Sequence, residues 1–141
     1  QKNKDRIGER IKKWAQNNLG RRMLSVERRR ARKLSLPNTL TPDQWQRCLE
    51  YWNGCCAYCG RPSGFFHMMS VDHFIALSDP NCIGTVADNC MPACSGTDGC
   101  NQSKASRPAA EWLESKFGKR KAKQILAKIA THFEWIAKQP T

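Results

Sequence analysis

An acidic residue and a histidine, Asp72 and His73, stand side by side mid-chain, and Asn89, Asn101 and Lys104 follow. Carboxylate and amide oxygens are ligands that Mg²⁺ and Mn²⁺ prefer, so Asp72 and Asn101 are candidate cation ligands. Imidazole titrates near neutral pH, so His73 is a candidate general base, its second ring nitrogen held by a carbonyl oxygen of Asn89. Lys104, on the same helical turn as Asn101, is a candidate phosphate contact. The set predicts metal-assisted hydrolysis of a phosphodiester.

Eight cysteines supply the material for a second site. Cys56 and Cys59 form a Cys-x-x-Cys pair, and Cys94 and Cys100 form a second pair with a longer spacing. Four thiolates suit a structural zinc ion, so these four cysteines are the predicted ligands, with Cys90 as the competing one. Disulfides in a secreted protein are the alternative, but the Cys-x-x-Cys spacing and the lack of a visible signal sequence favour zinc. Cys48 lies on the apolar face of a predicted helix and is expected to be a small core residue, Cys55 is expected to be packed or spare, and Cys82 has no close partner in the sequence.

The elements that must position these residues form a small α+β unit. Residues 65–71 predict a strand leading into the acidic residue and histidine, and residues 78–88 have the composition of a loop. A short helix is expected to start at Asn101. The stretch from Thr41 to Gln44 has the pattern of a capping box and predicts a helix to residue 53. Residues 108–117 and the following stretch to residue 136 predict two more helices.

Apolar residues at helical spacing within residues 122–136 form a stripe that is expected to pack into the core. His132 lies beside this stripe and is expected at the surface or at the boundary of the core. Met68 and Met69 precede the strand and are expected in the core. Near the other end of the chain, Gly20 is expected to end a first helix that begins at Asp5.

The formal net charge of +12 is unevenly distributed. Residues 1–36 carry 13 Lys and Arg against 3 acids, residues 37–103 carry 2 against 6, and residues 104–141 carry 9 against 3. Basic ends suit a nucleic acid, because each neutralised phosphate releases condensed counterions; solvated helix faces are the alternative. No apolar run is long enough to span a bilayer, so we expect a cytoplasmic protein of bacterial or phage type. The predicted nucleic-acid contacts of the first segment are Arg28, Arg29, Arg30, Arg32 and Lys33.

With these residues in place, the chain resembles the HNH endonuclease family, in the subgroup that carries a four-cysteine zinc site. The matching motifs lie within residues 56–113, less than half of the chain. Two departures stand out: the loop from Cys94 to Cys100 is longer than the common pattern, and Ala76 occupies a position where the family often has proline. The motifs are Cys56-Ala57-Tyr58-Cys59-Gly60, Val71-Asp72-His73-Phe74-Ile75, Asn89-Cys90-Met91-Pro92-Ala93-Cys94, Cys100-Asn101-Gln102-Ser103-Lys104 and Pro108-Ala109-Ala110-Glu111-Trp112-Leu113.

The resemblance implies a ββα-metal core, in which a two-stranded hairpin and a helix grip one divalent cation. It implies that His73 is the general base, that Asp72 and Asn101 bind Mg²⁺ or Mn²⁺, and that Asn89 orients His73. The implied reaction is cleavage of phosphodiester bonds in DNA. The expected organisation is a basic helical arm over residues 1–36 and a zinc-stapled nuclease domain with C-terminal helices over residues 37–141.

Two readings remain open at this point. A zinc-stabilised module that binds nucleic acid without catalysis would use the same basic ends and thiolates, but it would not need the set formed by Asp72, His73, Asn89 and Asn101. A nuclease with one cation site makes one cut at a time. Cleavage of both strands of duplex DNA would therefore require a homodimer, a larger complex or a second encounter.

Overall fold

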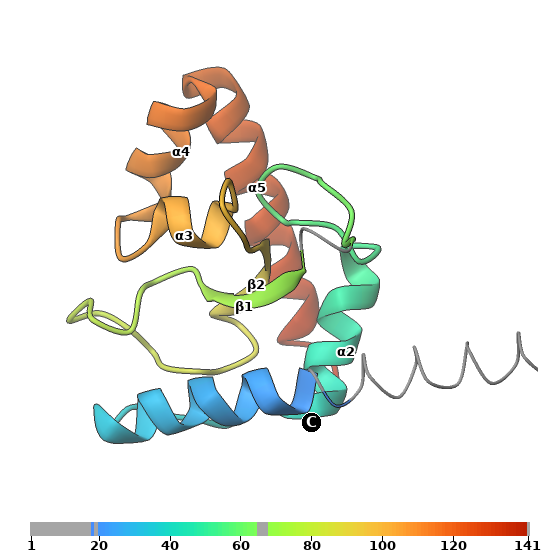
Figure 1. Cartoon of the computed structure of the whole chain (residues 1–141), viewed down its shortest axis with the longest axis vertical. Coiled ribbons are helices and arrows are strands. Elements are labelled where there is room, and N and C mark those ends of the chain that lie inside the picture. The colour runs from blue at the N-terminus through green and yellow to red at the C-terminus, as the bar shows by residue number, and fades with distance from the viewer. Residues whose placement is uncertain (1–17, 19, 65–67, 141) are drawn as a thin grey trace, which may run out of the picture.

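A computed structural model of the chain describes residue 18 and residues 20–64 and 68–140 (Figure 1). A helix over residues 20–33 is followed by α2 (Pro42–Tyr51), the strands β1 (Met69–His73) and β2 (Cys90–Cys94), and the helices α3 (Cys100–Lys104), α4 (Ala109–Phe117) and α5 (Lys119–Ile136). The strands pair antiparallel, with Met69 opposite Cys94 and His73 opposite Cys90. This mixture of helices with a small sheet is the predicted α+β class. None of the described helices is long and apolar enough to cross a membrane.

Helix α2 begins where the sequence predicts, because Thr41 forms a capping box with Gln44. The Gln44 backbone N–H donates to Thr41 Oγ1 at 3.2 Å, and the Thr41 backbone N–H donates to Gln44 Oε1 at 2.9 Å. Pro42 occupies the first turn, where its missing N–H costs no helical hydrogen bond. The helix buries Trp45 and Cys48 in the core, which agrees with the prediction that Cys48 is a small core residue.

Helix α5 packs its predicted apolar stripe into the core, but His132 does not lie at the surface. Its side chain is fully buried, and its ring centroid lies 4.8 Å from Tyr51 and 5.5 Å from Trp52 on or just after α2. His132 follows Ile129 by three residues and precedes Ile136 by four, so it belongs to the buried stripe itself. The expectation of an exposed position was wrong for that reason.

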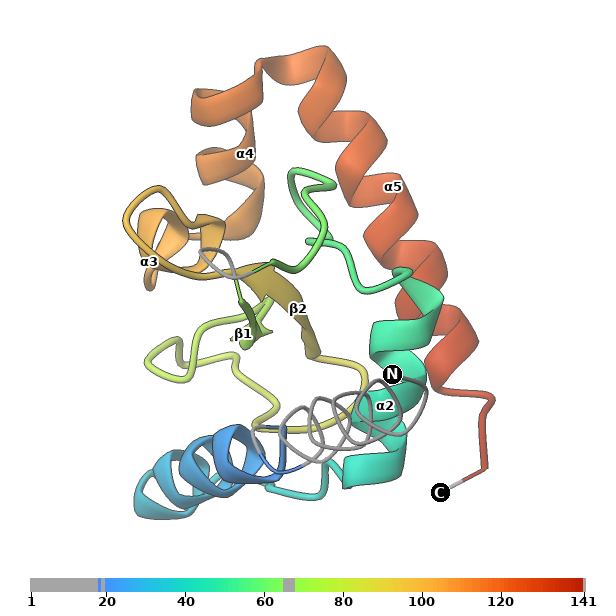
Figure 2. The same cartoon turned by 45° about the vertical axis from the view of Figure 1, so that its right-hand side comes forward.

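Gly20 is itself helical, as is Asn18, so the predicted helix end at this glycine is wrong. A Cβ atom on Gly20 would lie 3.6 Å from the Trp45 ring, an ordinary contact distance, so this end of the helix over residues 20–33 packs against α2. Leu24 and Ala31, seven residues apart on one face, are 3% and 0% exposed. In Figures 1 and 2 this helix (blue) lies along the long connection between β1 and β2. The predicted helix over residues 5–19 falls almost entirely outside the described residues.

The two methionines before β1 have opposite environments. Met69 is 6% exposed and belongs to the core, as predicted, whereas Met68 is 40% exposed, so its predicted burial was wrong. Successive side chains of an extended segment point to opposite faces, and only one face of this short strand meets the core at that end. The predicted strand begins at Met69, while residues 65–67 lie outside the described part of the chain.

Candidate metal centre and active site

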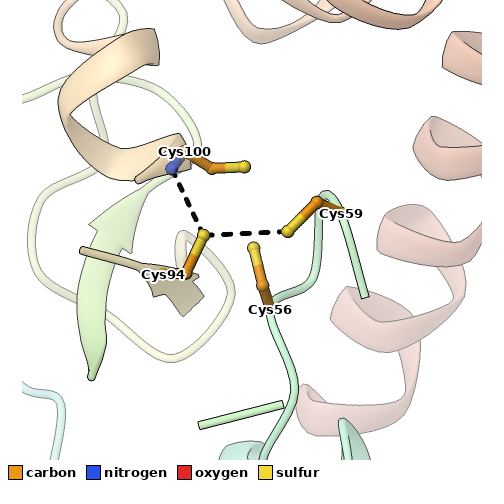
Figure 3. Close-up of side chains that lie close together, drawn as sticks. All are labelled: Cys56, Cys59, Cys94 and Cys100. Carbon is orange, nitrogen blue, oxygen red and sulfur yellow. Dashed lines mark hydrogen bonds between the residues drawn. The ribbon is translucent and has the colours of Figure 1, made fainter. Parts of the chain in front are cut away.

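Four cysteine sulfurs converge beside the sheet. The Sγ atoms of Cys56, Cys59, Cys94 and Cys100 all lie within 4.8 Å of one another (Figure 3). Cys59 Sγ and Cys94 Sγ are 3.7 Å apart, and a tetrahedral zinc ion with Zn–S bonds of about 2.3 Å holds its sulfurs about 3.8 Å apart. The donor set and its spacing therefore fit a metal ion such as zinc. The sequence singles out the same four cysteines.

Backbone hydrogen bonds explain how two distant pairs of cysteines meet. The segment over residues 56–60, which we call the knuckle, turns tightly. Gly60 has a φ of 73°, and its N–H donates to the Cys56 carbonyl at 2.9 Å. The Ala57 N–H donates to the Pro92 carbonyl at 2.8 Å, which fixes the knuckle to β2. In the longer loop, a Cβ atom on Gly99 would lie 2.6 Å from the Cys94 carbonyl oxygen. Glycine there lets the loop close on itself.

One thiol of the cluster, that of Cys56, is biased toward the charged form that a metal requires, whereas burial raises the pKa of Cys59. A hydrogen bond from Cys100 lowers the pKa of Cys56 to about 5, against the opposing effect of burial. The same interaction raises the pKa of Cys100, so the pair shares one proton. The Cys94 sulfur also accepts the Cys100 backbone N–H at 3.3 Å.

Cys90, the competing ligand, lies outside this cluster. It is 1% exposed, and its carbonyl oxygen accepts a hydrogen bond from the Cys48 thiol, 3.7 Å away. Burial raises the pKa of both thiols, as expected for inert core cysteines. The structure therefore separates the four clustered cysteines from Cys48 and Cys90. All eight cysteines are free thiols.

Asp72 points toward the cysteine side of β1, where two polar groups hold its carboxylate. Tyr58 Oη donates to Asp72 Oδ2 at 2.6 Å, and Lys104 Nζ lies 3.4 Å from the same oxygen. Burial raises the pKa of Asp72, and Lys104 and Tyr58 oppose that rise. Both contacts are made by the same carboxylate oxygen, Oδ2.

Lys104 is a structural residue in this arrangement. Its side chain is 0% exposed, and Nζ donates to the His73 carbonyl at 2.9 Å while it pairs with Asp72. The predicted contact between Lys104 and a substrate phosphate does not fit this burial. Short α3 turns its last residue inward onto β1, so the ammonium neutralises a buried carboxylate instead.

Asn101 reaches the same strand from the start of α3. Its Nδ2 donates to Ser70 Oγ at 2.6 Å, and Ser70 stands two residues before Asp72, on the same face of β1. The amide oxygen of Asn101, the atom that a hard cation requires, is therefore directed away from Ser70. Asn101 lines a cavity of about 230 Å³ between β1, α3 and the helix over residues 20–33, whose other lining residues are Arg22, Met23, Val26, Glu27, Ser70 and Val71.

His73 faces the opposite side of β1, toward the connection between the strands. Its Nε2 lies 2.9 Å from Thr85 Oγ1, and its Nδ1 lies 3.9 Å from Glu27 Oε2. The ring is 8% exposed. Burial, together with the positive charges of Lys104 and Arg30, lowers the pKa of His73 to about 4. The imidazole is therefore neutral at pH 7, as a general base must be.

Asn89 does not hold the His73 ring, contrary to the prediction. Its side chain accepts from the Ile75 N–H at 2.9 Å and donates to the carbonyls of Ile75 and Gly84 at 3.1 and 3.0 Å. Its own carbonyl accepts the Phe74 N–H at 2.8 Å. Asn89 therefore shapes the backbone immediately after His73, and Thr85 takes the predicted place at the ring.

Sequence reasoning missed Thr85 and Glu27. Thr85 lies in a segment that has only the composition of a loop, and nothing in its spacing relates it to His73. Glu27 gives a clearer signal, because it is the one acidic residue between Arg10 and Pro42 in a strongly basic stretch. A single acidic residue in a basic stretch indicates a specific contact, and this signal could have identified Glu27.

Comparison with known proteins gives one informative relative. The chain is 32% identical to the "SPbeta prophage-derived putative HNH endonuclease YoqL" of Bacillus subtilis (strain 168), over 70% of its own length. It spans 42% of the length of that relative. No protein-family model matches the chain, and no solved structure matches it either. The relative and the cysteine cluster both agree with the HNH resemblance.

Proposed function

We propose that this chain is a metal-dependent DNA endonuclease that hydrolyses phosphodiester bonds with one divalent cation per active site. The observation that carries the proposal is the position of His73. This histidine is anchored through Nε2, it sits at the end of the strand whose opposite face carries Asp72, and burial lowers its pKa to about 4, which favours the neutral form that a general base needs. The HNH name of the prophage relative supports the same reaction class.

The proposed reaction uses His73 as the base that takes a proton from the attacking water. Asn101, whose amide oxygen is directed away from Ser70, and Asp72 would hold Mg²⁺ or Mn²⁺. When bound, the cation stabilises negative charge on the scissile phosphate and on the leaving 3′ oxygen. Lys104 keeps the strand carbonyl of His73 and the carboxylate of Asp72 in place, and Asn89 fixes the backbone that follows.

A structural zinc ion in the cysteine cluster is part of the proposal. The cluster joins the knuckle at Cys56 and Cys59, the end of β2 at Cys94 and the start of α3 at Cys100. Asn101 directly follows the last of these ligands. Zinc would therefore fix the position of a cation ligand as well as the small fold around it.

The helix over residues 20–33, called the basic helix from here on, is the proposed contact with double-stranded DNA. Its exposed residues Arg29, Arg32 and Lys33 form no side-chain hydrogen bond or ion pair with another described residue. Arg28 and Arg30 are also exposed, although Arg28 donates to the Asn38 carbonyl and Arg30 pairs with Glu27. Such a surface gives affinity that is independent of sequence and falls steeply with salt.

A nucleic-acid-binding module without catalysis is the second candidate. The pairing of Lys104 with Asp72 favours it, because an ammonium 3.4 Å from the carboxylate competes with a divalent cation. The two candidates differ in what His73 does. In the nuclease it takes part in the reaction, and in the binding module it is only a buried polar residue.

The test is incubation of supercoiled plasmid with the wild type and with His73→Ala in the presence of Mg²⁺ or Mn²⁺. We expect nicked or linear product from the wild type and a loss of at least about 100-fold in rate for His73→Ala, with DNA binding retained. Equal cleavage by the variant would remove His73 from the mechanism. No cleavage by the wild type with either metal would favour the binding module.

A further inference from the structure

The carboxylate of Glu27 faces His73 from the basic helix, outside the segment that resembles the HNH family. We infer that Glu27 is a catalytic residue that, together with His73, holds the attacking water. The inference rests on the proposed nuclease function and adds a residue to its active site. It is carried by the tautomer of His73, by the separation of two acceptor atoms and by the way the helix is anchored.

The hydrogen bonds of Thr85 determine which nitrogen of His73 carries a proton. Thr85 Oγ1 donates its single proton to the Glu27 carbonyl oxygen at 3.3 Å. It must therefore accept from His73 Nε2–H at 2.9 Å. A general base needs one unprotonated ring nitrogen, and with Nε2–H bonded to Thr85 that nitrogen is Nδ1. The basic atom of His73 is thus Nδ1, and it is the ring atom that faces Glu27.

The separation of Nδ1 and Glu27 Oε2 suits a shared water molecule. The two acceptors are 3.9 Å apart, too far for a direct hydrogen bond. A water molecule about 2.8 Å from each would see them at an angle of roughly 90°, comparable with the angle between its two O–H bonds. Both protons of such a water are engaged by the protein. Its lone pairs are directed away from both acceptors, which is the orientation that attack on phosphorus requires.

The backbone fixes the position of this carboxylate. Leu24 and Ala31 bury the helix on either side of Glu27, and Thr85 bonds to the Glu27 carbonyl itself. The side chain of Glu27 is only 15% exposed. A residue held at its own backbone, with its carboxylate largely buried, is placed more accurately than one on a mobile arm.

The surrounding charges allow a phosphate to approach despite the carboxylate. Arg30 Nη1 lies 3.2 and 3.3 Å from the two oxygens of Glu27 and offsets its charge. Arg22 lines the same cavity as Glu27, Ser70 and Asn101. The cavity therefore has a cationic side chain on one wall, a carboxylate on the same helix and the proposed cation ligand Asn101 on the other wall.

The chemical step balances as follows. The water oxygen forms a bond to phosphorus while His73 Nδ1 takes one of its protons, and the bond between phosphorus and the 3′ oxygen breaks. The leaving 3′ oxygen takes a proton from solvent and becomes a hydroxyl, and the imidazolium later returns its proton to solvent. Glu27 remains ionised throughout and accepts the second hydrogen bond of the water.

The test compares Glu27→Gln with Glu114→Gln in the plasmid assay, with kcat and KM measured on a short duplex. Glu114 is an exposed residue on α4, and its variant makes the same change in net charge. Figure 1 shows α4 at the opposite end of the molecule from the helix over residues 20–33. We expect Glu27→Gln to lower kcat about 10- to 100-fold with KM within about two-fold, because its amide group also offers N–H donors to the water. DNA binding, measured without divalent metal, should be unchanged or tighter.

Three outcomes of this comparison decide whether Glu27 is a catalytic residue. Loss of kcat in Glu27→Gln beside an active Glu114→Gln supports the inference. A kcat equal to that of Glu114→Gln overturns it while leaving the nuclease proposal standing, and an inactive wild type overturns both. If Glu27→Gln loses its native circular dichroism, Glu27→Asp replaces it. That variant keeps the charge, withdraws the carboxylate by one methylene and is expected to lower kcat as well; an unchanged kcat would count against the inference.

Discussion

The cysteine cluster and the His73 site are built in different ways, although both include a residue of α3. All four sulfurs come from residues 56–100, and two tight turns bring them together. The groups around His73 come from the basic helix, from the connection between the strands and from the end of α3. In the first site the spacing within each cysteine pair is local and the contact of Ala57 with β2 brings the two pairs together, whereas every group around His73 comes from a different segment.

The largest effect is expected from loss of the cluster. Cys94→Ser, or a strong zinc chelator, should abolish cooperative unfolding, because the metal contributes most of the folding free energy in small zinc units. We expect about one zinc per wild-type chain by elemental analysis. Cys55→Ser is the matched control, since the Cys55 thiol donates a hydrogen bond to the Asn53 carbonyl and lies outside the cluster. A Cys94→Ser variant that melts like Cys55→Ser would show that the fold does not depend on the cluster.

Lys104 joins the two regions and gives the next largest effect. Lys104→Met leaves Asp72 buried without its cation and should lower the free energy of unfolding by about 3 to 5 kcal/mol in urea titrations. Its affinity for DNA should change little after correction for the folded fraction.

Lys33→Met should behave in the opposite way, with nearly normal stability and weaker, less salt-dependent binding of DNA. Fluorescence anisotropy at several salt concentrations measures this difference. A stable Lys104→Met variant that binds DNA poorly would restore Lys104 as a phosphate contact.

The cysteine cluster can be predicted from the sequence to a greater extent than the His73 site. The capping box at Thr41 and the Cys-x-x-Cys pair obey rules that act within a few residues, and the structure contains both. Glu27 and Thr85 come next to His73 only because the basic helix packs against the connection between the strands. No periodicity or spacing encodes that contact. The prediction for His132 was wrong for a different reason, because its spacing from Ile129 and Ile136 already places it on the apolar stripe of α5.

His132 shows the effect of burial alone on the pKa of a histidine, because it is buried but belongs to neither the cysteine cluster nor the His73 site. Burial lowers its pKa to about 4, from a usual value near 6.5. The unfolded chain therefore binds a proton that the folded chain does not, so stability is full above about pH 6.5 and falls as the pH drops toward 4.

At pH 5 the loss from His132 is about 2 kcal/mol relative to pH 7.5. His132→Phe should remove this part of the pH dependence of the unfolding free energy, measured by urea titration at both pH values. His73, whose pKa is also about 4, contributes a similar loss that remains in the variant. An unchanged pH dependence would mean that His132 is solvated in the folded chain.

A smaller loss of stability than that of Lys104→Met is expected for Thr85→Val, which acts only on the His73 site. It removes the acceptor of His73 Nε2–H and the bond to the Glu27 carbonyl, and should cost roughly 1 to 2 kcal/mol of stability. Its cleavage rate should fall much further than that stability loss explains, because the tautomer of His73 is no longer fixed. Thr131→Val is the control, since Thr131 is exposed on α5 and its hydroxyl donates to the Ala127 carbonyl within the same helix. Equal rates for the two variants would remove Thr85 from the site.

Three residues of helix α3 point in different directions, and each contacts a different part of the molecule. Cys100 meets the sulfur cluster, Asn101 meets Ser70 beside the cavity, and Lys104 meets Asp72 in the interior. One residue inserted after Asn101 would rotate Lys104 by about 100° around the helix axis and shift it by about 1.5 Å. The ammonium would then leave the interior, whatever residue was inserted. The length of this five-residue segment is therefore under a stricter constraint than the identity of Gln102, whose side chain is exposed to solvent.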